Sequence, residues 1–266
     1  MKILIKKVGA YPSDFHTENM KRKHCILSDV PKAPCDVDDL SSLPYIPIKP
    51  LPAKSFIMYI VGTPGSGKSN LWQAMLISKL PKRYYRGFFD HIEIISASLG
   101  TLSKKVTKQL PERQQHTELT DDLVTDIIGT MRTKPNQNNL LVLDDVIKAI
   151  TRSKVLSTIF LNRRHVTHNP SEEGFGGLAI MITSQKYNLL PLEFRGACDN
   201  VILFKTSNAS ERRAIKEELM QDLSKEQQDH LLAQAWKEPY SFLFIRTNQP
   251  LHSRYYIRFD SVQEFP

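Results

Sequence analysis

The string GTPGSGKS, Gly62–Ser69, constrains the fold of this chain more than any other feature of its sequence. It fits the pattern G-x-x-x-x-G-K-[ST], in which backbone N–H groups of a glycine-rich loop surround phosphates. The apolar run SFIMYIV before it predicts a buried strand, and a stretch with helical character follows it. A strand, a glycine-rich turn and a helix in this order predict a nucleotide site, the alternative being a coincidental glycine turn.

The residue types of this loop suit a nucleoside triphosphate bound with magnesium. Glycines let the backbone approach phosphates without a Cβ in the way, and the helix N-terminus adds its dipole. The Lys68 ammonium would contact the β- and γ-phosphates, and the Ser69 hydroxyl would bind Mg²⁺. We therefore expect ATP and Mg²⁺ as ligands. The expected nucleotide-binding residues are Gly62, Thr63, Pro64, Gly65, Ser66, Gly67, Lys68, Ser69 and Asn70.

Predicted strands alternate with predicted helices along the rest of the chain. The expected strands are Ser55–Val61, His91–Ser98, Asn139–Leu143, Gly177–Thr183 and Asn200–Phe204, and the expected helices are Ser69–Leu80, Asp121–Met131, Ser153–His165, Ala209–Met220 and Lys225–Trp236. This alternation predicts an α/β domain with a mostly parallel sheet and helices on both faces. The last alternating runs, Tyr240–Arg246 and Arg254–Phe259, could form a hairpin that extends the sheet edge.

The first 54 residues differ from the rest in composition. Six prolines between Pro31 and Pro52 predict an extended, irregular segment, and Lys2–Val8 could be a short strand. We expect an N-terminal proline-rich arm over residues 1–54, followed by a nucleotide-binding domain over residues 55–266. The arm would wrap over the domain or reach a neighbour, unless it is a loosely ordered leader.

Composition restricts the partners and the compartment. The formal net charge is +8 and the sequence pI about 9.3, which favours a polyanionic partner such as nucleic acid. The cysteines Cys25, Cys35 and Cys198 form no zinc or disulfide pattern, as is typical of free thiols in a reducing compartment. No apolar run approaches the roughly 20 residues that span a bilayer, so we expect a soluble intracellular protein without membrane contact.

Two acids follow the apolar run LLVL at the end of the third predicted strand. In phosphate-loop proteins an acid at this place holds magnesium. We assign that role to Asp144, and we assign to Asp145 the orientation or activation of the attacking water. The alternative is a plain helix N-cap.

A glutamine ends the fourth predicted strand in the string ITSQK. Gln185 is therefore the candidate sensor of the γ-phosphate or of the attacking water, as glutamine is in some NTPases. Ser184 is the second candidate. The alternative is a polar residue bonded to nearby backbone.

Candidate arginine fingers come from two places. Arg163 and Arg164 end a predicted helix, where arginines usually interact with the helix dipole, and the spacing alone favours that interpretation. Either could instead reach the γ-phosphate of a neighbouring subunit, as could Arg195, whose alternative is an ordinary surface arginine. His165 and His168 have helical spacing but lack a third metal ligand.

In combination these motifs resemble the poxvirus-type genome packaging ATPases of large DNA viruses and virophages, within the FtsK–HerA superfamily. The resemblance covers about Ser55 to Phe259. It rests on Gly62–Ser69, the Asp144–Asp145 pair, the Arg164–His165 element and Gln185 in that order, with the glutamine as the most telling part. It departs from the wider class in one place, because many members have Glu where this chain has Asp145. Asp144 and Asp145 could therefore exchange roles.

The resemblance implies a motor that hydrolyses ATP and drives double-stranded DNA into a preformed capsid. It implies the strand order 5-1-4-3-2 and a homo-oligomeric ring, of five or six subunits, with ATP at the subunit interface. It further implies Lys68, Asp145, Gln185 and Arg164 as catalytic residues, with Arg164 supplied by the next subunit. The capsid or portal vertex would be a partner, and the host cytoplasm, virus factory or virion the location.

Three other classes compete with this interpretation. A DNA translocase or helicase-like ATPase of the same superfamily would share the fold and motifs without packaging DNA. A nucleoside kinase would need an acceptor pocket and an arginine-bearing lid, and Gln185 with the acidic pair argues against it. A scaffold protein that binds nucleotide without turnover would show no DNA-stimulated hydrolysis.

Overall fold

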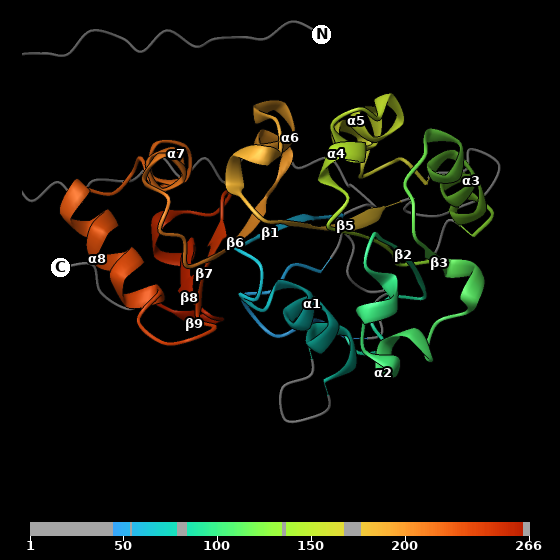
Figure 1. Ribbon diagram of the computed structural model, residues 1–266, viewed down its shortest axis with the longest axis horizontal. Coiled ribbons are helices and arrows are strands. Elements are labelled where there is room, and N and C mark those ends of the chain that lie inside the picture. The colour runs from blue at the N-terminus through green and yellow to red at the C-terminus, as the bar shows by residue number, and fades with distance from the viewer. Residues whose placement is uncertain (1–44, 54, 79–83, 135–136, 168–176, 263–266) are drawn as a thin grey trace, which may run out of the picture. The chain divides into compact units, whose positions relative to one another are not determined.

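Figure 1 shows the computed structural model, which describes residues 45–53, 55–78, 84–134, 137–167 and 177–262. The described residues form a nine-stranded sheet in the order β3-β2-β4-β5-β1-β6-β7-β8-β9. The strands are β1 Ile57–Val61, β2 His91–Ser96, β3 Gln115–His116, β4 Asn139–Asp144, β5 Leu178–Ser184, β6 Asn200–Phe204, β7 Phe242–Arg246, β8 Tyr255–Ile257 and β9 Asp260–Ser261.

Helices cover both faces of this sheet. They are α1 Lys68–Ile77, α2 Lys104–Thr107, α3 Asp121–Arg132, α4 Ile147–Ile150, α5 Lys154–Asn162, α6 Leu192–Ala197, α7 Ala209–Leu219 and α8 Lys225–Ala235. Figure 1 shows α1 and α2 on one side of the sheet and α3 to α6 on the other. The single-turn 3₁₀ helices η3 Leu99–Thr101, η4 Glu112–Gln114, η5 Tyr187–Leu189 and η6 Leu251–Ser253 lie in the connections.

The predicted α/β architecture is confirmed. The five strands expected from the sequence are β1, β2, β4, β5 and β6, and their observed order β6-β1-β5-β4-β2 is the expected 5-1-4-3-2. All neighbours within this group pair in parallel. β7 pairs antiparallel with β6 and with β8, so the expected C-terminal hairpin does extend the sheet.

The strand sequences build two cores. Alternate side chains of β1 point to opposite faces, so that Ile57, Tyr59 and Val61 join one core and Met58 and Ile60 join the other. The first core packs against α3 to α8 and the second against α1 and α2. Burial on both faces explains the continuous apolar runs of the central strands.

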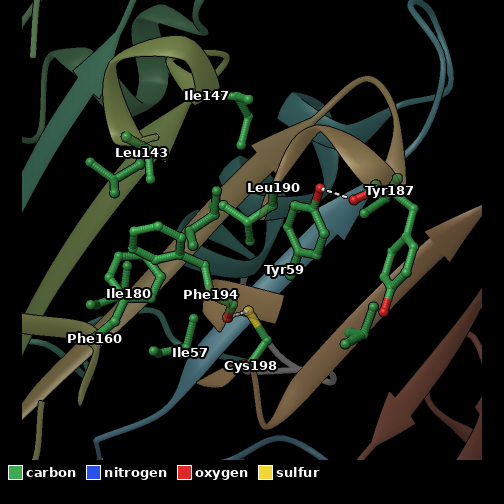
Figure 2. Close-up of a cluster of buried hydrophobic side chains, with 14 of the residues drawn as sticks. Ile57, Tyr59, Leu143, Ile147, Phe160, Ile180, Tyr187, Leu190, Phe194 and Cys198 are labelled. Carbon is green, nitrogen blue, oxygen red and sulfur yellow. Dashed lines mark hydrogen bonds between the residues drawn. The ribbon is translucent and has the colours of Figure 1, made fainter. Parts of the chain in front are cut away.

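Figure 2 shows the part of the first core that lies under α5 and α6. The Tyr59 hydroxyl donates to the backbone oxygen of Tyr187 at 2.9 Å, which satisfies its one polar atom inside the core. Cys198 is a buried free thiol whose Sγ donates to the Phe194 carbonyl, and burial raises the pKa of this thiol. Cys25 and Cys35 lie outside the described residues.

Side-chain caps explain where several helices begin. Thr120, Ser153, Asn208 and Ser224 each accept a backbone N–H of the first helical turn, of α3, α5, α7 and α8 respectively. The helix expected over Ser153–His165 is shorter in the structure, where α5 ends at Asn162. The strands β3 and β9 and the short helices α2 and α4 were not predicted, since each has four residues or fewer and no resolvable period.

The described part of the predicted arm, residues 45–53, contacts the domain. Leu51 is buried in the second core, and the Tyr85 hydroxyl donates to the backbone oxygen of Pro52 at 2.8 Å. The Tyr45 hydroxyl donates to the backbone oxygens of Tyr84 and Arg86. The rest of the arm, including the possible strand Lys2–Val8, lies outside the described residues, so the boundary at residue 54 stays a prediction. Within the described ranges no helix is long and apolar enough to cross a bilayer.

An ion pair joins three elements at the amino end of the sheet. The Arg163 guanidinium contacts the Asp199 carboxylate at 3.0 Å and donates to the backbone oxygen of Ser55 at 2.8 Å. Asp199 also accepts the backbone N–H of Ile57, the first residue of β1. Both charged side chains are less than one-fifth exposed. The pair therefore fixes the end of α5 to the start of β1 and β6.

We expect Arg163→Ala to lower the free energy of unfolding by about 2 kcal/mol, because hydrogen bonds to charged groups contribute about 1.5–3 kcal/mol. The adjacent Arg164 is exposed, and Arg164→Ala should change stability by less than about 0.5 kcal/mol. Urea denaturation of both variants measures the difference. Equal effects of the two substitutions would contradict this role of the ion pair.

Candidate nucleotide-binding site

The glycine-rich loop has the backbone geometry of a phosphate cradle. It connects the end of β1 at Val61 to the start of α1 at Lys68. Gly65 and Gly67 have φ angles of 78° and 102°, which glycine adopts without steric cost. A Cβ on Gly62 would lie 2.7 Å from the Cβ of Phe204, so the loop has no room for a side chain there. Gly67 supplies no side-chain cap, which leaves the first N–H groups of α1 available to an anion.

Lys68, the first residue of α1, extends its side chain back across this loop. Its side chain is 8% exposed, and its Nζ donates to the backbone oxygens of Gly62 at 2.7 Å and of Thr63 at 3.1 Å. Burial lowers the pKa of Lys68, and the nearby carboxylates of Asp145 and Asp144 oppose that shift. Phosphate oxygens would be stronger acceptors for this ammonium than the two carbonyls.

Asp144 is fully buried and connects four elements through its carboxylate. Its Oδ1 accepts hydrogen bonds from three side chains: Ser69 Oγ at 3.1 Å, Trp72 Nε1 at 3.2 Å and Thr183 Oγ1 at 2.8 Å. Its Oδ2 accepts one from Ser96 Oγ at 3.0 Å. These donors come from α1, β5 and β2, while Asp144 ends β4. These four donors satisfy the hydrogen-bonding capacity of a carboxylate that has no contact with solvent.

Asp145 and Gln185 form an exposed pair beside this buried group. Asp145 has a φ angle of 56°, and its backbone N–H donates to Thr183 Oγ1 at 2.9 Å. Gln185 Nε2 donates to both carboxylate oxygens of Asp145 at 3.2 Å. Both side chains line a cleft of about 630 Å³ that also reaches Lys148 and Glu118. The Thr183 hydroxyl thus bonds to the buried carboxylate of Asp144 and to the backbone of Asp145, whose side chain faces solvent.

The oxygen donors next to the loop suit magnesium. Ser69 Oγ and Asp144 Oδ1 lie 3.1 Å apart, and both are hard oxygen ligands. Mg²⁺ is usually held by one or two protein carboxylates together with substrate phosphates and water. The described residues contain no group of three or more His, Cys, Asp or Glu side chains that could hold a metal ion by themselves. Ser69, Asp144 and a phosphate on the loop would fit Mg²⁺ in this way.

A second cleft, of about 490 Å³, lies on the other side of the loop. It is lined by Thr63–Ser66, by the residues after β6 and by the loop between α8 and β7. Tyr240 in that loop has a φ angle of 59°, a left-handed conformation that costs a residue other than glycine about 1–2 kcal/mol. Its side chain is 72% exposed.

The three candidate arginine fingers have different surroundings. Arg163 is held by Asp199. Arg195 forms a two-point ion pair with Glu218, at 2.8 Å and 2.7 Å, and its guanidinium lies 4.9 Å from the centre of the Tyr187 ring. Hydrogen bonding to Glu218 raises the pKa of Arg195. Arg164 is exposed, and no described residue bonds to its side chain. Among these three arginines, Arg164 is the one whose side chain has no hydrogen bond or ion pair with the residues that the structure describes.

Arg164 lies at the opposite end of the sheet from its own phosphate loop. Its neighbour Arg163 contacts the segment before β1, and five residues of β1 separate that point from the loop, a distance of about 16 Å at roughly 3.3 Å per residue. Arg164 therefore lies too far from the phosphate loop of its own chain to contact a nucleotide bound there. His165 is exposed, and His168 lies outside the described residues, so the histidine pair is not tested.

The structure corrects one candidate and adds residues that the sequence did not identify. Ser184 is buried and donates to the backbone oxygen of Lys186, so it does not face the site, whereas Gln185 does. Asn70 is exposed on the first turn of α1. Sequence reasoning identified Ser69 but missed the other three donors to Asp144 and the second cleft. No local motif marks Ser96, Trp72 or Thr183, because only the sheet order brings them together.

Comparisons with known proteins concern the segment around the phosphate loop and the fold. The family model described as the NB-ARC domain matches residues 50–166, which include the phosphate loop and both acids. The structure resembles the genome packaging NTPase B204 of Sulfolobus turreted icosahedral virus 2 in complex with sulfate, with a TM-score of 0.54 and 16% identity over 80% of this chain and 100% of that one. No curated protein sequence matches significantly.

Two further structures of B204 proteins are also similar to the structure of this chain. B204 of Sulfolobus turreted icosahedral virus 2 in complex with ATP-gammaS has a TM-score of 0.54 and 16% identity over 78% of this chain and 98% of that one. B204, the DNA-packaging ATPase of Sulfolobus Turreted Icosahedral Virus, has a TM-score of 0.50 and 14% identity over 79% and 100%. At these identities the likeness concerns the fold. The chain has the α/β fold of a P-loop NTPase, with the features of a nucleotide site at the carboxyl end of its sheet.

Proposed function

We propose that this chain is a Mg²⁺-dependent ATPase that drives double-stranded viral DNA into preformed capsids, acting as a homo-oligomeric ring in the host cytoplasm, virus factory or virion. The observation that carries the ATPase part is the exposed Asp145–Gln185 pair next to the buried Lys68 and Asp144. Packaging is supported by the order of the motifs and by the fold likeness to B204, which extends over that whole chain. The net charge of +8 supports a polyanionic partner.

The residues at the phosphate loop would have separate roles in ATP hydrolysis. Backbone N–H groups of the loop and Lys68 would hold the β- and γ-phosphates. Ser69 and Asp144 would hold Mg²⁺, which neutralises phosphate charge when bound. The burial of Asp144 and the exposure of Asp145 favour this assignment over the exchanged roles.

Asp145 and Gln185 would act on the attacking water. The water oxygen would form a bond to the γ-phosphorus while the Asp145 carboxylate accepts a proton from that water. ADP would leave with the electron pair of the broken P–O bond. Gln185 donates to Asp145 and would orient the same water. The cleft of about 630 Å³ beside this pair has room for a side chain from a neighbouring subunit. Arg164 of that subunit is our candidate for this group.

Hydrolysis of ATP by the purified protein, with and without double-stranded DNA, tests the proposal across a series of protein concentrations. A motor with shared sites predicts DNA-stimulated turnover that rises cooperatively with concentration, and Lys68→Ala should remove it. Turnover that depends on neither DNA nor concentration would contradict the motor. DNA stimulation without capsid-dependent DNA uptake would instead favour a non-packaging translocase of similar architecture.

A mixture of two inactive variants tests the shared site. Arg164→Ala should bind ATP normally and lose about 10³–10⁵-fold in turnover, the range for an arginine finger. Lys68→Ala should lose its own phosphate site yet still offer Arg164 to a neighbour. Mixing the two should therefore restore part of the DNA-stimulated turnover. Arg163→Ala serves as the control, because its effect should follow stability alone. Parent-like turnover by Arg164→Ala would rule out this residue as the finger.

A further inference from the structure

Two clefts lie at the carboxyl end of the sheet, on either side of the phosphate loop. The first contains Asp145 and Gln185, at the ends of β4 and β5. The second lies beside Thr63–Ser66 and next to β6 and β7. Because β1 stands between β5 and β6 in the sheet, a phosphate chain on the loop has one cleft at each end.

The catalytic pair determines which end of a bound nucleotide occupies which cleft. The γ-phosphate must lie toward Asp145 and Gln185 if these residues act on the attacking water. The nucleoside then extends to the other side of the loop. We propose that the cleft of about 490 Å³ binds the nucleoside and that the base stacks on the ring of Tyr240. The proposal rests on nucleotide binding at the loop and does not depend on DNA packaging.

Tyr240 has the properties of a stacking platform. It is a large aromatic side chain, 72% exposed, on the wall of a cleft that adjoins the phosphate loop. Its Cδ1 lies 3.5 Å from the position that a Cβ on Gly67 would take, so the ring packs directly against the loop. Aromatic rings bind nucleobases by stacking whatever the base, because every base has a π-face.

The backbone conformation of Tyr240 also indicates a functional role for this residue. Tyr240 has a left-handed φ of 59° without being glycine, and such outliers concentrate at ligand sites. The turn that holds it is closed by a hydrogen bond from the Ser241 N–H to the Glu238 oxygen at 3.2 Å. A solvent-exposed tyrosine gains little folding free energy at such a position, where glycine would be unstrained.

The other walls of the cleft suit a nucleoside. Phe204 supplies an apolar surface, and Lys205, Ser207 and Glu238 supply polar groups around it. The volume of about 490 Å³ lies within the roughly 300–1,000 Å³ typical of small-molecule sites. A base stacked on the Tyr240 ring, with the ribose near the polar groups, matches that composition.

Binding of two ligands to four proteins tests the proposal. Calorimetry with Mg²⁺ present would compare ATP with inorganic tripolyphosphate, which carries the phosphates without the nucleoside. The proteins are the parent, Tyr240→Phe, Tyr240→Ala and Tyr240→Gly. We expect the alanine and glycine variants to bind ATP about 10–100-fold more weakly, the range for loss of one stacking contact, with tripolyphosphate binding unchanged. Tyr240→Phe keeps the ring and should resemble the parent.

Tyr240→Gly separates binding from folding, because glycine accepts the left-handed backbone without strain. It should melt at or above the temperature of the alanine variant while sharing its weak ATP binding. Parent-like ATP affinity in both variants would overturn the proposal. An equal loss of affinity for ATP and for tripolyphosphate would also overturn it, because Tyr240 would then only support the loop. A parent protein that binds neither ligand would overturn it as well.

Together with the DNA-stimulated hydrolysis assay, this binding experiment distinguishes the nucleoside site from the proposed function. If the base-dependent loss is observed but DNA never stimulates hydrolysis, the nucleoside site stands and the motor does not. Lys68→Ala should weaken the binding of both ligands, because Lys68 is the proposed phosphate contact and not a base contact.

Discussion

The rest of the site depends on the hydrogen bonds that the carboxylate of Asp144 accepts. This carboxylate is fully buried and accepts hydrogen bonds from side chains of α1, β2 and β5. A buried charge needs several donors to offset the loss of hydration, and here those donors also determine the geometry. Thr183 donates to Asp144 and accepts the backbone N–H of Asp145, so the same hydroxyl fixes where the second acid points. The phosphate loop, the metal ligands and the exposed acid are thus held by one polar network.

The order of strands explains why these groups meet. A parallel sheet brings the carboxyl ends of its strands to one edge, where ligands bind in α/β proteins. β1 at the centre carries the loop, β4 and β5 carry the acids and Gln185, and β6 and β7 border the second cleft. One linear ligand with a reactive phosphate end and an aromatic end would fit across this edge. Arg164 lies at the opposite edge, and its contact with another subunit is our proposal.

The central part of the fold was predictable from the sequence because local signals and global topology agree. The glycine loop, the apolar strand runs and the acids all have fixed spacing along the chain, and the resemblance to packaging ATPases supplied the strand order. The tertiary details were not predictable. The burial of Ser184, the Arg195–Glu218 ion pair and the donors to Asp144 depend on contacts between residues far apart in sequence. Tyr240 lies in a short polar loop whose left-handed backbone has no glycine to mark it.

The most direct test of this account is the Mg²⁺ dependence of ATP binding by Asp144→Asn. An amide keeps an acceptor oxygen for Ser69, Trp72 and Thr183, and its NH₂ group can donate to the Ser96 hydroxyl, so the network should persist without its charge. The parent should bind ATP more tightly with Mg²⁺ than without it. The variant should remain folded, and should lose at least about tenfold in affinity only when Mg²⁺ is present. A folded variant that binds Mg²⁺–ATP as tightly as the parent would contradict the central role of this carboxylate.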